Sequence, residues 1–353
     1  MVRIPGSLLM YWRVNSMEMK RHLNCSMIEP LESRRLLSAV SVMTQNVYYG
    51  GGGTGSFLSG FTDLWQKVQQ SNIPQRASAI AAEIKREKPD LVALQEVVVW
   101  RTGSIFGSAD DVRYDFLARM MAKLRRGKAR YAVVSKVSNA DWEIPGQVGS
   151  SLQNIRMTDQ DVILARVGPG ARLRILDEAH GNFRQRVDVP IPGLGRDIDF
   201  TRGWASVDAR IGTNGPRFRF INTHLEVFDA GVQQKQARAL LKGRAKTRLP
   251  LIVAGDFNAD ANGGDATYTL LADAGLNDAW KTVHPGNSGP TCCQDENLQN
   301  TESNLSRRID LVMVRGKHFR PTDAELVGEE PGDKTPSGLW PSDHAGVVVR
   351  LDL

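Results

Sequence analysis

The stretch LIVAGDFN, residues 251–258, carries more information about fold and site than any other part of this chain. Its four leading apolar residues predict a buried strand, and Asp256 and Asn258 follow at the point where the strand ends. Because side chains alternate along an extended chain, these two project to the same side. The first is an acceptor and a potential base, and the second offers donors and acceptors. Such a pair suits a site that holds a water molecule and a phosphate oxygen together.

Polar residues close or follow strand-like apolar runs at five further places. They are Asn46 in MTQNV, Glu96 in LVALQEV, His224 in FINTHLE, Asp310 in RRIDLVMV, and Ser342-Asp343-His344 before the last apolar run. Each alone has an ordinary explanation, such as a turn asparagine or a surface ion pair. Strand ends meet at one edge of a sheet, so together these residues predict one functional site.

The rest of the chain alternates between helical and strand-like patterns from residue 40 onward. Apolar spacing predicts helices over 75–87, 110–126, 232–244 and 267–274. Strands are predicted over 40–48, 90–94, 132–137, 162–167, 171–176, 205–211, 218–222, 251–254, 309–314 and 345–351. Strands come both singly between helices and in consecutive pairs. This mixture predicts an α/β (α+β) fold of stacked sheets with helices outside.

Composition permits several functions and excludes few. The chain has 353 residues, 41% hydrophobic and 24% charged, and can bury a large core. No apolar run is long enough to span a membrane. Residues 1–40 hold six basic and three acidic residues, which leaves +3 of the net charge of +6 for the remainder. A polyanionic substrate such as nucleic acid is therefore permitted but not required.

The three cysteines, Cys25, Cys292 and Cys293, rule out a disulfide framework. They also lack the spacing of a metal site. A bond between adjacent cysteines needs a distorted peptide unit, so we expect free thiols.

The N-terminal 40 residues are predicted to lie outside the folded domain. The segment IEPLESRRLLSA, residues 28–39, resembles the Leu-Glu-Pro-Arg-x-Leu-Leu segment near the N-terminus of many exported bacterial surface proteins, with Ser33 in place of the usual proline. The resemblance implies a targeting segment and an exported protein. The alternative is a disordered tail after a misassigned start, on a cytoplasmic protein. Residues 41–353 form the predicted catalytic domain.

The order of the polar motifs, above all Gly-Asp-Phe-Asn with a late Ser-Asp-His, resembles the endonuclease/exonuclease/phosphatase superfamily over residues 41–353. That superfamily includes DNase I-like nucleases, inositol polyphosphate phosphatases and neutral sphingomyelinases. The resemblance implies a four-layer αββα sandwich, two mixed sheets packed face to face between helices. It also implies a phosphoesterase that depends on Mg²⁺ or Mn²⁺.

The resemblance assigns a role to each motif residue. Glu96 matches the metal-binding glutamate, with Asn46 and Asp343 close to the metal. Asp256 matches the residue that orients or deprotonates the attacking water, and Asn258 the amide on a phosphate oxygen. His344 matches a histidine that contacts the phosphate. Two further matches are Asp310, a carboxylate that orients His344, and His224, a second histidine of several branches.

The substrate stays open at this stage. A phosphodiester in nucleic acid is one candidate, and a lipid head group or inositol phosphate is the alternative. A non-catalytic binding or surface protein of the same fold is a rival from a different class. We expect the chain to act as a monomer.

Overall fold

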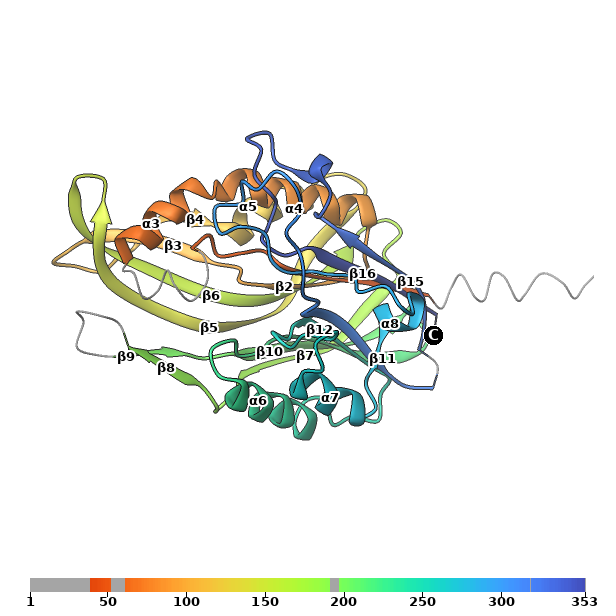
Figure 1. Ribbon diagram of the computed structural model, residues 1–353. Helices are drawn as coiled ribbons and strands as arrows, with labels where there is room; N and C mark the ends of the chain where they lie inside the picture. The colour runs from red at the N-terminus through yellow and green to blue at the C-terminus, as the bar shows by residue number, and fades with distance from the viewer. Residues whose placement is uncertain (1–38, 52–60, 191–196, 318, 353) are drawn as a thin grey trace, which may run out of the picture.

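The computed structural model describes residues 39–51, 61–190, 197–317 and 319–352 (Figure 1). The predicted N-terminal segment of residues 1–40 lies almost wholly outside these ranges, so its targeting role stays a prediction. Among the described residues, no helix combines the length and the apolar character needed to cross a membrane.

The first sheet has eight strands in the order β15-β16-β1-β2-β6-β3-β4, with β5 also paired to β6. The strands are β1 (Val40–Asn46), β2 (Leu91–Gln95), β3 (Val99–Ser104), β4 (Asp111–Asp115), β5 (Arg130–Val148), β6 (Ser151–Val167), β15 (Arg320–Val327) and β16 (Gly346–Asp352). β1 and β2 are parallel, whereas β16 runs antiparallel to β1. The sheet is therefore mixed.

The second sheet has six strands in the order β13-β14-β12-β11-β10-β7. The strands are β7 (Leu173–Asn182), β10 (Gly203–Ile211), β11 (Arg217–His224), β12 (Leu251–Asp256), β13 (Asn277–Asp278) and β14 (Asp310–Arg315). β11 and β12 are parallel and β14 is antiparallel to β12. A separate hairpin is made by β8 (Val187–Pro190) and β9 (Asp197–Phe200).

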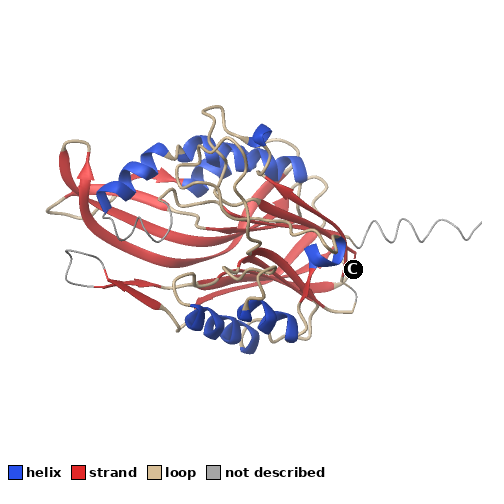
Figure 2. Ribbon diagram, viewed as in Figure 1, coloured by secondary structure: helices blue, strands red, loops and turns tan. Residues whose placement is uncertain are grey.

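Helices cover the outer face of each sheet, and Figure 2 shows the strands gathered between them. The helices are α3 (Phe61–Gln70), α4 (Ile73–Glu87) and α5 (Phe116–Leu124) on the first sheet, α6 (Ala230–Lys242) and α7 (Ala266–Asp273) on the second, and α8 (Ala279–Val283) against β14 and β15. A short 3-10 helix spans Pro331–Asp333. The predicted four-layer sandwich is thus confirmed.

Strand β12 shows why the layers form. Ile252 and Ala254 pack into the core between the two sheets, while Leu251 and Val253 pack under the helices of the second sheet. Because both faces of the strand are covered, it needs a continuous apolar run rather than alternation. The run LIVA in the sequence is therefore the signature of a central strand.

Two expectations from the sequence need correction. The predicted helix over 110–126 begins only at Phe116, because Asp115 caps it by accepting from the Ala118 amide, and residues 111–115 pair with β3 as β4. The predicted strands 132–137 and 162–167 are parts of the long β5–β6 hairpin. Polar residues such as Lys136 and Asn139 interrupt its apolar pattern, so the pattern predicts shorter strands than the structure contains.

Candidate active site

The predicted site residues come from one edge of the sandwich. Two parallel pairs of strands end there, β1 with β2 and β11 with β12. Their antiparallel neighbours, β16 and β14, begin there. His224 is the register partner of Asp256, which is in turn the partner of Asp310. Asn46 pairs with Gln95, the residue before Glu96. Strand pairing thus places side chains from both sheets around one point.

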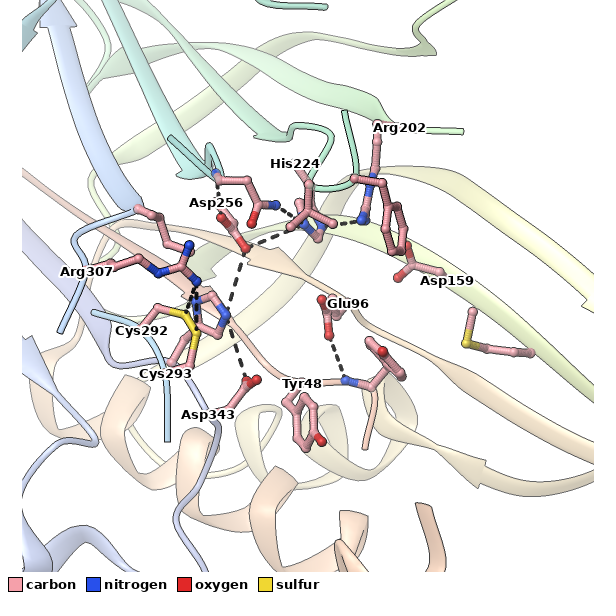
Figure 3. A pocket seen from close by; sticks show the side chains of 17 residues that line it. Tyr48, Glu96, Asp159, Arg202, His224, Asp256, Cys292, Cys293, Arg307 and Asp343 are labelled. Atoms are coloured by element: carbon pink, nitrogen blue, oxygen red, sulfur yellow. Dashed lines mark hydrogen bonds and ion pairs between the residues drawn. A yellow bond between two sulfur atoms is a disulfide. The ribbon is translucent and has the colours of Figure 1, made fainter. Parts of the chain in front are cut away.

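A cavity of about 250 Å³ opens at this edge (Figure 3). Its wall includes six of the eight predicted site residues, which are Glu96, His224, Asp256, Asn258, Asp343 and His344. The other two, Asn46 and Asp310, are buried directly behind the wall. All eight therefore lie together, six in the cavity wall and two directly behind it.

Asp256 is the centre of the polar network and is almost fully buried. Its Oδ2 accepts from Asn46 Nδ2 at 3.0 Å, and its Oδ1 accepts from the Asn258 backbone amide at 2.9 Å. Oδ2 also lies 3.5 Å from His224 Nε2 and 4.0 Å from His344 Nε2. The carboxylate is held firmly, and it keeps an oxygen near both imidazoles.

Asn46 uses both ends of its amide inside the protein. Besides donating to Asp256, it accepts from the Tyr48 backbone amide at 2.9 Å through Oδ1. Asn46 thereby orients the Asp256 carboxylate from behind the cavity wall.

His344 is paired with a buried carboxylate. Its Nδ1 lies 2.8 Å from Asp310 Oδ2, and its backbone amide donates to Ser342 Oγ. Burial disfavours the imidazolium, but Asp310, Asp343 and Asp256 outweigh burial and raise the pKa of His344 well above its ordinary value. Burial also raises the pKa of Asp310 to about 6, against the pull of His344. We therefore assign the proton of the pair to His344, which directs a charged Nε2–H into the cavity.

His224 has the opposite environment. Its Nδ1 lies 3.0 Å from Nη1 of Arg202, the residue before β10. Burial, then Arg202 and His344, lower the pKa of His224 well below its ordinary value. The two histidines of the site therefore have opposite electrostatic environments, one beside a cation and one beside carboxylates.

Glu96, Asp343 and Asp159 add three carboxyl groups to the cavity wall. Burial, with repulsion from Asp343 and Asp159, raises the pKa of Glu96 to about 8. Burial likewise raises the pKa of Asp343 and of Asp159. Within the described residues, Asp159 Oδ1 is buried without a hydrogen-bond partner. Poorly solvated carboxyl oxygens in one cavity wall are the donors that a hard divalent cation neutralises, so the chemistry of these residues fits a Mg²⁺ or Mn²⁺ site.

Two of the eight predicted site residues adopt left-handed backbone conformations. Glu96 has φ of 58° and Asn258 has φ of 51°. Such strain in residues other than glycine concentrates at functional sites, where it aims a side chain that regular strand geometry would turn away. Asn258 can thereby place its Nδ2 3.0 Å from the Leu225 carbonyl and 3.2 Å from His224 Nε2.

Sequence patterns did not identify Arg202 or Arg307 as parts of the site. Arg202 precedes an ordinary strand, and Arg307 sits in a polar loop, so neither carried a signal of its own. Both line the cavity, with Asp159, which the sequence left unassigned. Arg307 Nη2 lies 3.5 Å from Cys292 Sγ and 3.7 Å from Cys293 Sγ.

The expectation of free thiols at residues 292 and 293 is wrong. Cys292 and Cys293 form a disulfide within the cavity wall (Figure 3). The backbone of Cys292 bridges to both Arg307 and His344, which places the cysteine pair beside these two residues of the cavity wall.

Comparison with known proteins identifies the class. Residues 43–344 match the model of the Endonuclease/Exonuclease/phosphatase family. The match spans most of the chain, and the chain therefore belongs to this family. Members of the family hydrolyse phosphate esters. No curated protein matches the sequence.

Solved structures show the same fold at low identity. A family member from Bacteroides thetaiotaomicron has a TM-score of 0.56 and 20% identity, covering 89% of this chain and 97% of that chain. D. rerio TDP2 complexed with a single-strand DNA product has a TM-score of 0.53 and 18% identity, covering 90% and 100%. The mannosyl-6-phosphatase Bt3783 of Bacteroides thetaiotaomicron VPI-5482 has a TM-score of 0.53 and 19% identity, covering 89% of this chain and 100% of that chain.

Proposed function

We propose that this protein is a divalent-metal-dependent phosphoesterase that hydrolyses a phosphodiester by in-line attack of water. The observation that carries the proposal is the position of Asp256. Its Oδ2 lies between Asn46, at 3.0 Å, and the imidazoles of His224 and His344, at 3.5 and 4.0 Å. The same cavity is lined by Glu96 and Asp343. An acceptor, two imidazole donors and carboxylates that can hold a metal are groups that phosphoryl transfer uses.

In this mechanism Asp256 orients the attacking water and accepts its proton. The water oxygen bonds to phosphorus while the ester oxygen leaves on the opposite side. Asn258, His224 and His344 donate hydrogen bonds to the phosphoryl oxygens, and the positive charge of His344 offsets the charge that develops there. Asp310 supports that charge from behind.

Glu96, Asp343 and Asp159 would hold the metal. A bound Mg²⁺ or Mn²⁺ supplies charge neutralisation and lowers the pKa of a coordinated oxygen. Asn46, which the family resemblance places beside the metal, would act on the site through Asp256, because its amide donates to that carboxylate.

A phosphodiester in nucleic acid is the substrate that we propose first. Arg202 and Arg307 add two guanidinium groups to the cavity wall, and these favour a substrate with more than one negative charge. The similar structure of D. rerio TDP2 with a DNA product is consistent with this choice. The mannosyl-6-phosphatase among the similar structures makes a phosphate monoester the alternative.

The test uses the purified full-length protein with supercoiled plasmid and with bis(p-nitrophenyl) phosphate. Each substrate is incubated with Mg²⁺, with Mn²⁺ and with EDTA, beside the variant His344→Ala. We expect metal-dependent hydrolysis that falls by about 100-fold or more in the variant. Folding of the variant is checked by circular dichroism.

The outcomes separate the candidates. Cleavage of the plasmid supports a nuclease, whereas hydrolysis of the small diester alone redirects the search to lipid head groups and phosphosugars. Failure of every ester under all metal conditions would overturn the proposal in favour of a non-catalytic binding protein.

A further inference from the structure

Arg202, one of the two arginines of the cavity wall, is buried and faces His224. It is 7% exposed and directly precedes β10. Gly203, the next residue, is the register partner of His224, and the Thr223 hydroxyl donates to the Gly203 carbonyl. Strand pairing therefore holds the backbone of Arg202 beside His224, and Figure 3 shows the two side chains meeting.

The chemistry of the guanidinium constrains the imidazole. Arginine is a donor only and keeps its charge in proteins. Arg202 Nη1 lies 3.0 Å from His224 Nδ1, so that nitrogen must present a lone pair. A charged His224 would instead turn an N–H toward a cation in a buried place. A neutral imidazole then carries its proton on Nε2, which lies 3.5 Å from Asp256 Oδ2 and 3.2 Å from Asn258 Nδ2. The Asn258 amide nitrogen donates to the Leu225 carbonyl at 3.0 Å, which leaves the Nε2–H to face the Asp256 carboxylate.

The second histidine shows the contrast. Asp310 is an acceptor, and it faces Nδ1 of His344 at 2.8 Å. Nδ1 of His224 thus faces Arg202, which can donate but cannot accept, whereas Nδ1 of His344 faces Asp310, which accepts and cannot donate when ionised. The two partners give the imidazoles opposite protonation at Nδ1.

We propose that Arg202 is a positioning residue that holds His224 neutral with its proton on Nε2. In this form His224 can donate one hydrogen bond to Asp256 or to a phosphoryl oxygen. It cannot take a proton from water at Nε2, because that nitrogen is already protonated. The base for the attacking water is therefore Asp256. This inference deepens the proposed function, and it rests on that function only for its activity readout.

The first measurement reads the tautomer directly. The full chain is labelled with ¹⁵N-histidine, and long-range ¹H–¹⁵N spectra of the imidazoles are recorded at neutral pH in EDTA. The signals of His224, one of six histidines, are assigned by their loss in His224→Gln. We expect a pyridine-type Nδ1 and a protonated Nε2. A protonated Nδ1, or an imidazolium, would overturn the proposal.

The second measurement removes the guanidinium. In Arg202→Met we expect signals of the other tautomer or of the imidazolium, and kcat for bis(p-nitrophenyl) phosphate about 10-fold or more below wild type. Arg202→Lys keeps a donor and should retain the Nε2–H form with partial activity. The matched control is Arg210→Met, at the far end of β10, where the arginine donates to the Thr213 carbonyl. It should leave both readouts unchanged.

The readouts distinguish this inference from the proposed function. Unchanged His224 signals in folded Arg202→Met would overturn the role of Arg202, whatever the activity. If Arg202→Met does not fold, the imidazole spectra of the wild type and of Arg202→Lys test the role of Arg202 instead. An inactive protein with the expected tautomer would refute the phosphoesterase proposal but leave the positioning role intact.

Discussion

At the scale of single residues, two aspartates of the site have different surroundings. Asp256 and Asp310 are both buried aspartates, and both lie close to a histidine. Asp310 makes a 2.8 Å contact to His344, whereas Asp256 keeps 4.0 Å from the same imidazole. The first is therefore committed to an ion pair, and the second has room for a water molecule. Sequence neighbours do not reveal this difference, because it is set by distances across the sheet.

The distinct role of Asp256 gives a prediction for Asp256→Asn. This nearly isosteric change keeps an acceptor for the Asn46 amide, sets its own NH2 against the Asn258 backbone amide, and removes the proton acceptor for water. We expect kcat for bis(p-nitrophenyl) phosphate to fall by about 100- to 10,000-fold, with a small drop in melting temperature from the lost hydrogen bond. Steady-state kinetics and thermal unfolding are the two measurements. A variant with more than half of wild-type turnover would show that another group is the base.

At the scale of elements, helix α4 links the site to the outer layer. Arg76 of α4 is fully buried and donates to the carbonyls of Val47 and Tyr48, directly after β1, and to that of Pro341, before the Ser-Asp-His triplet. One helical side chain therefore ties together two of the segments that supply the site. This contact explains why a charged residue occupies the apolar face of the helix.

Glu83 of α4 is a second buried charge, and it gives a pH-dependent prediction. Both of its carboxyl oxygens are buried without a hydrogen-bond partner among the described residues, and burial raises its pKa from 4.5 to about 8. Between these values the folded state keeps a proton that the unfolded chain has lost. The free energy of unfolding therefore falls as the pH rises from about 4.5 to about 8.

Glu83→Gln removes this titration. We expect the variant to exceed wild type in unfolding free energy by on the order of 2 kcal/mol at pH 8 and by nearly nothing at pH 4. Urea unfolding at a series of pH values measures the difference, with the exposed Glu302→Gln as control. A difference that does not change with pH would show that Glu83 is not protonated in the folded protein.

At the scale of the whole molecule, the face-to-face packing of the two sheets brings residues from both into one site. Glu96 and Asp343 come from the first sheet and Asp256 from the second, and all three line the same cavity. Burial raises the pKa of Glu96 and of Asp343, so this arrangement of carboxyl groups opposes folding until their charge is neutralised. Metal binding should therefore be coupled to global stability.

The coupling predicts that Mg²⁺ or Mn²⁺ raises the melting temperature. At a concentration 100 times the dissociation constant, binding to the folded state alone adds about 2.7 kcal/mol, or about 5 °C for a domain of this size. Differential scanning fluorimetry with each ion and with EDTA measures the shift. Glu96→Gln should lose most of it. A full shift in Glu96→Gln would place the ion elsewhere.

The sequence by itself determined the alternation of strands and helices and the polar residues that close the strands, and its resemblance to the family supplied the four layers. The run LIVA at 251–254 predicts a central strand because only a strand covered on both faces needs it. The strand-ending motifs, read with the family resemblance, named all eight residues that the structure brings to one edge. Local patterns failed for the long β5–β6 hairpin and for the first residues of the predicted helix at 110, where polar strands resemble loops or helices.

Only the tertiary structure decided which residues face one another. Arg202 lies 22 positions from His224, and their contact exists because β10 and β11 pair in one register. The carboxyl groups of Glu96, Asp159 and Asp343 and the guanidinium of Arg307 likewise come from segments distant in the sequence and meet only in the cavity wall. Hydrogen bonds and pKa values depend on distances of a few ångströms and on burial. Both are set by the packing of distant segments, so no local pattern in the sequence encodes them.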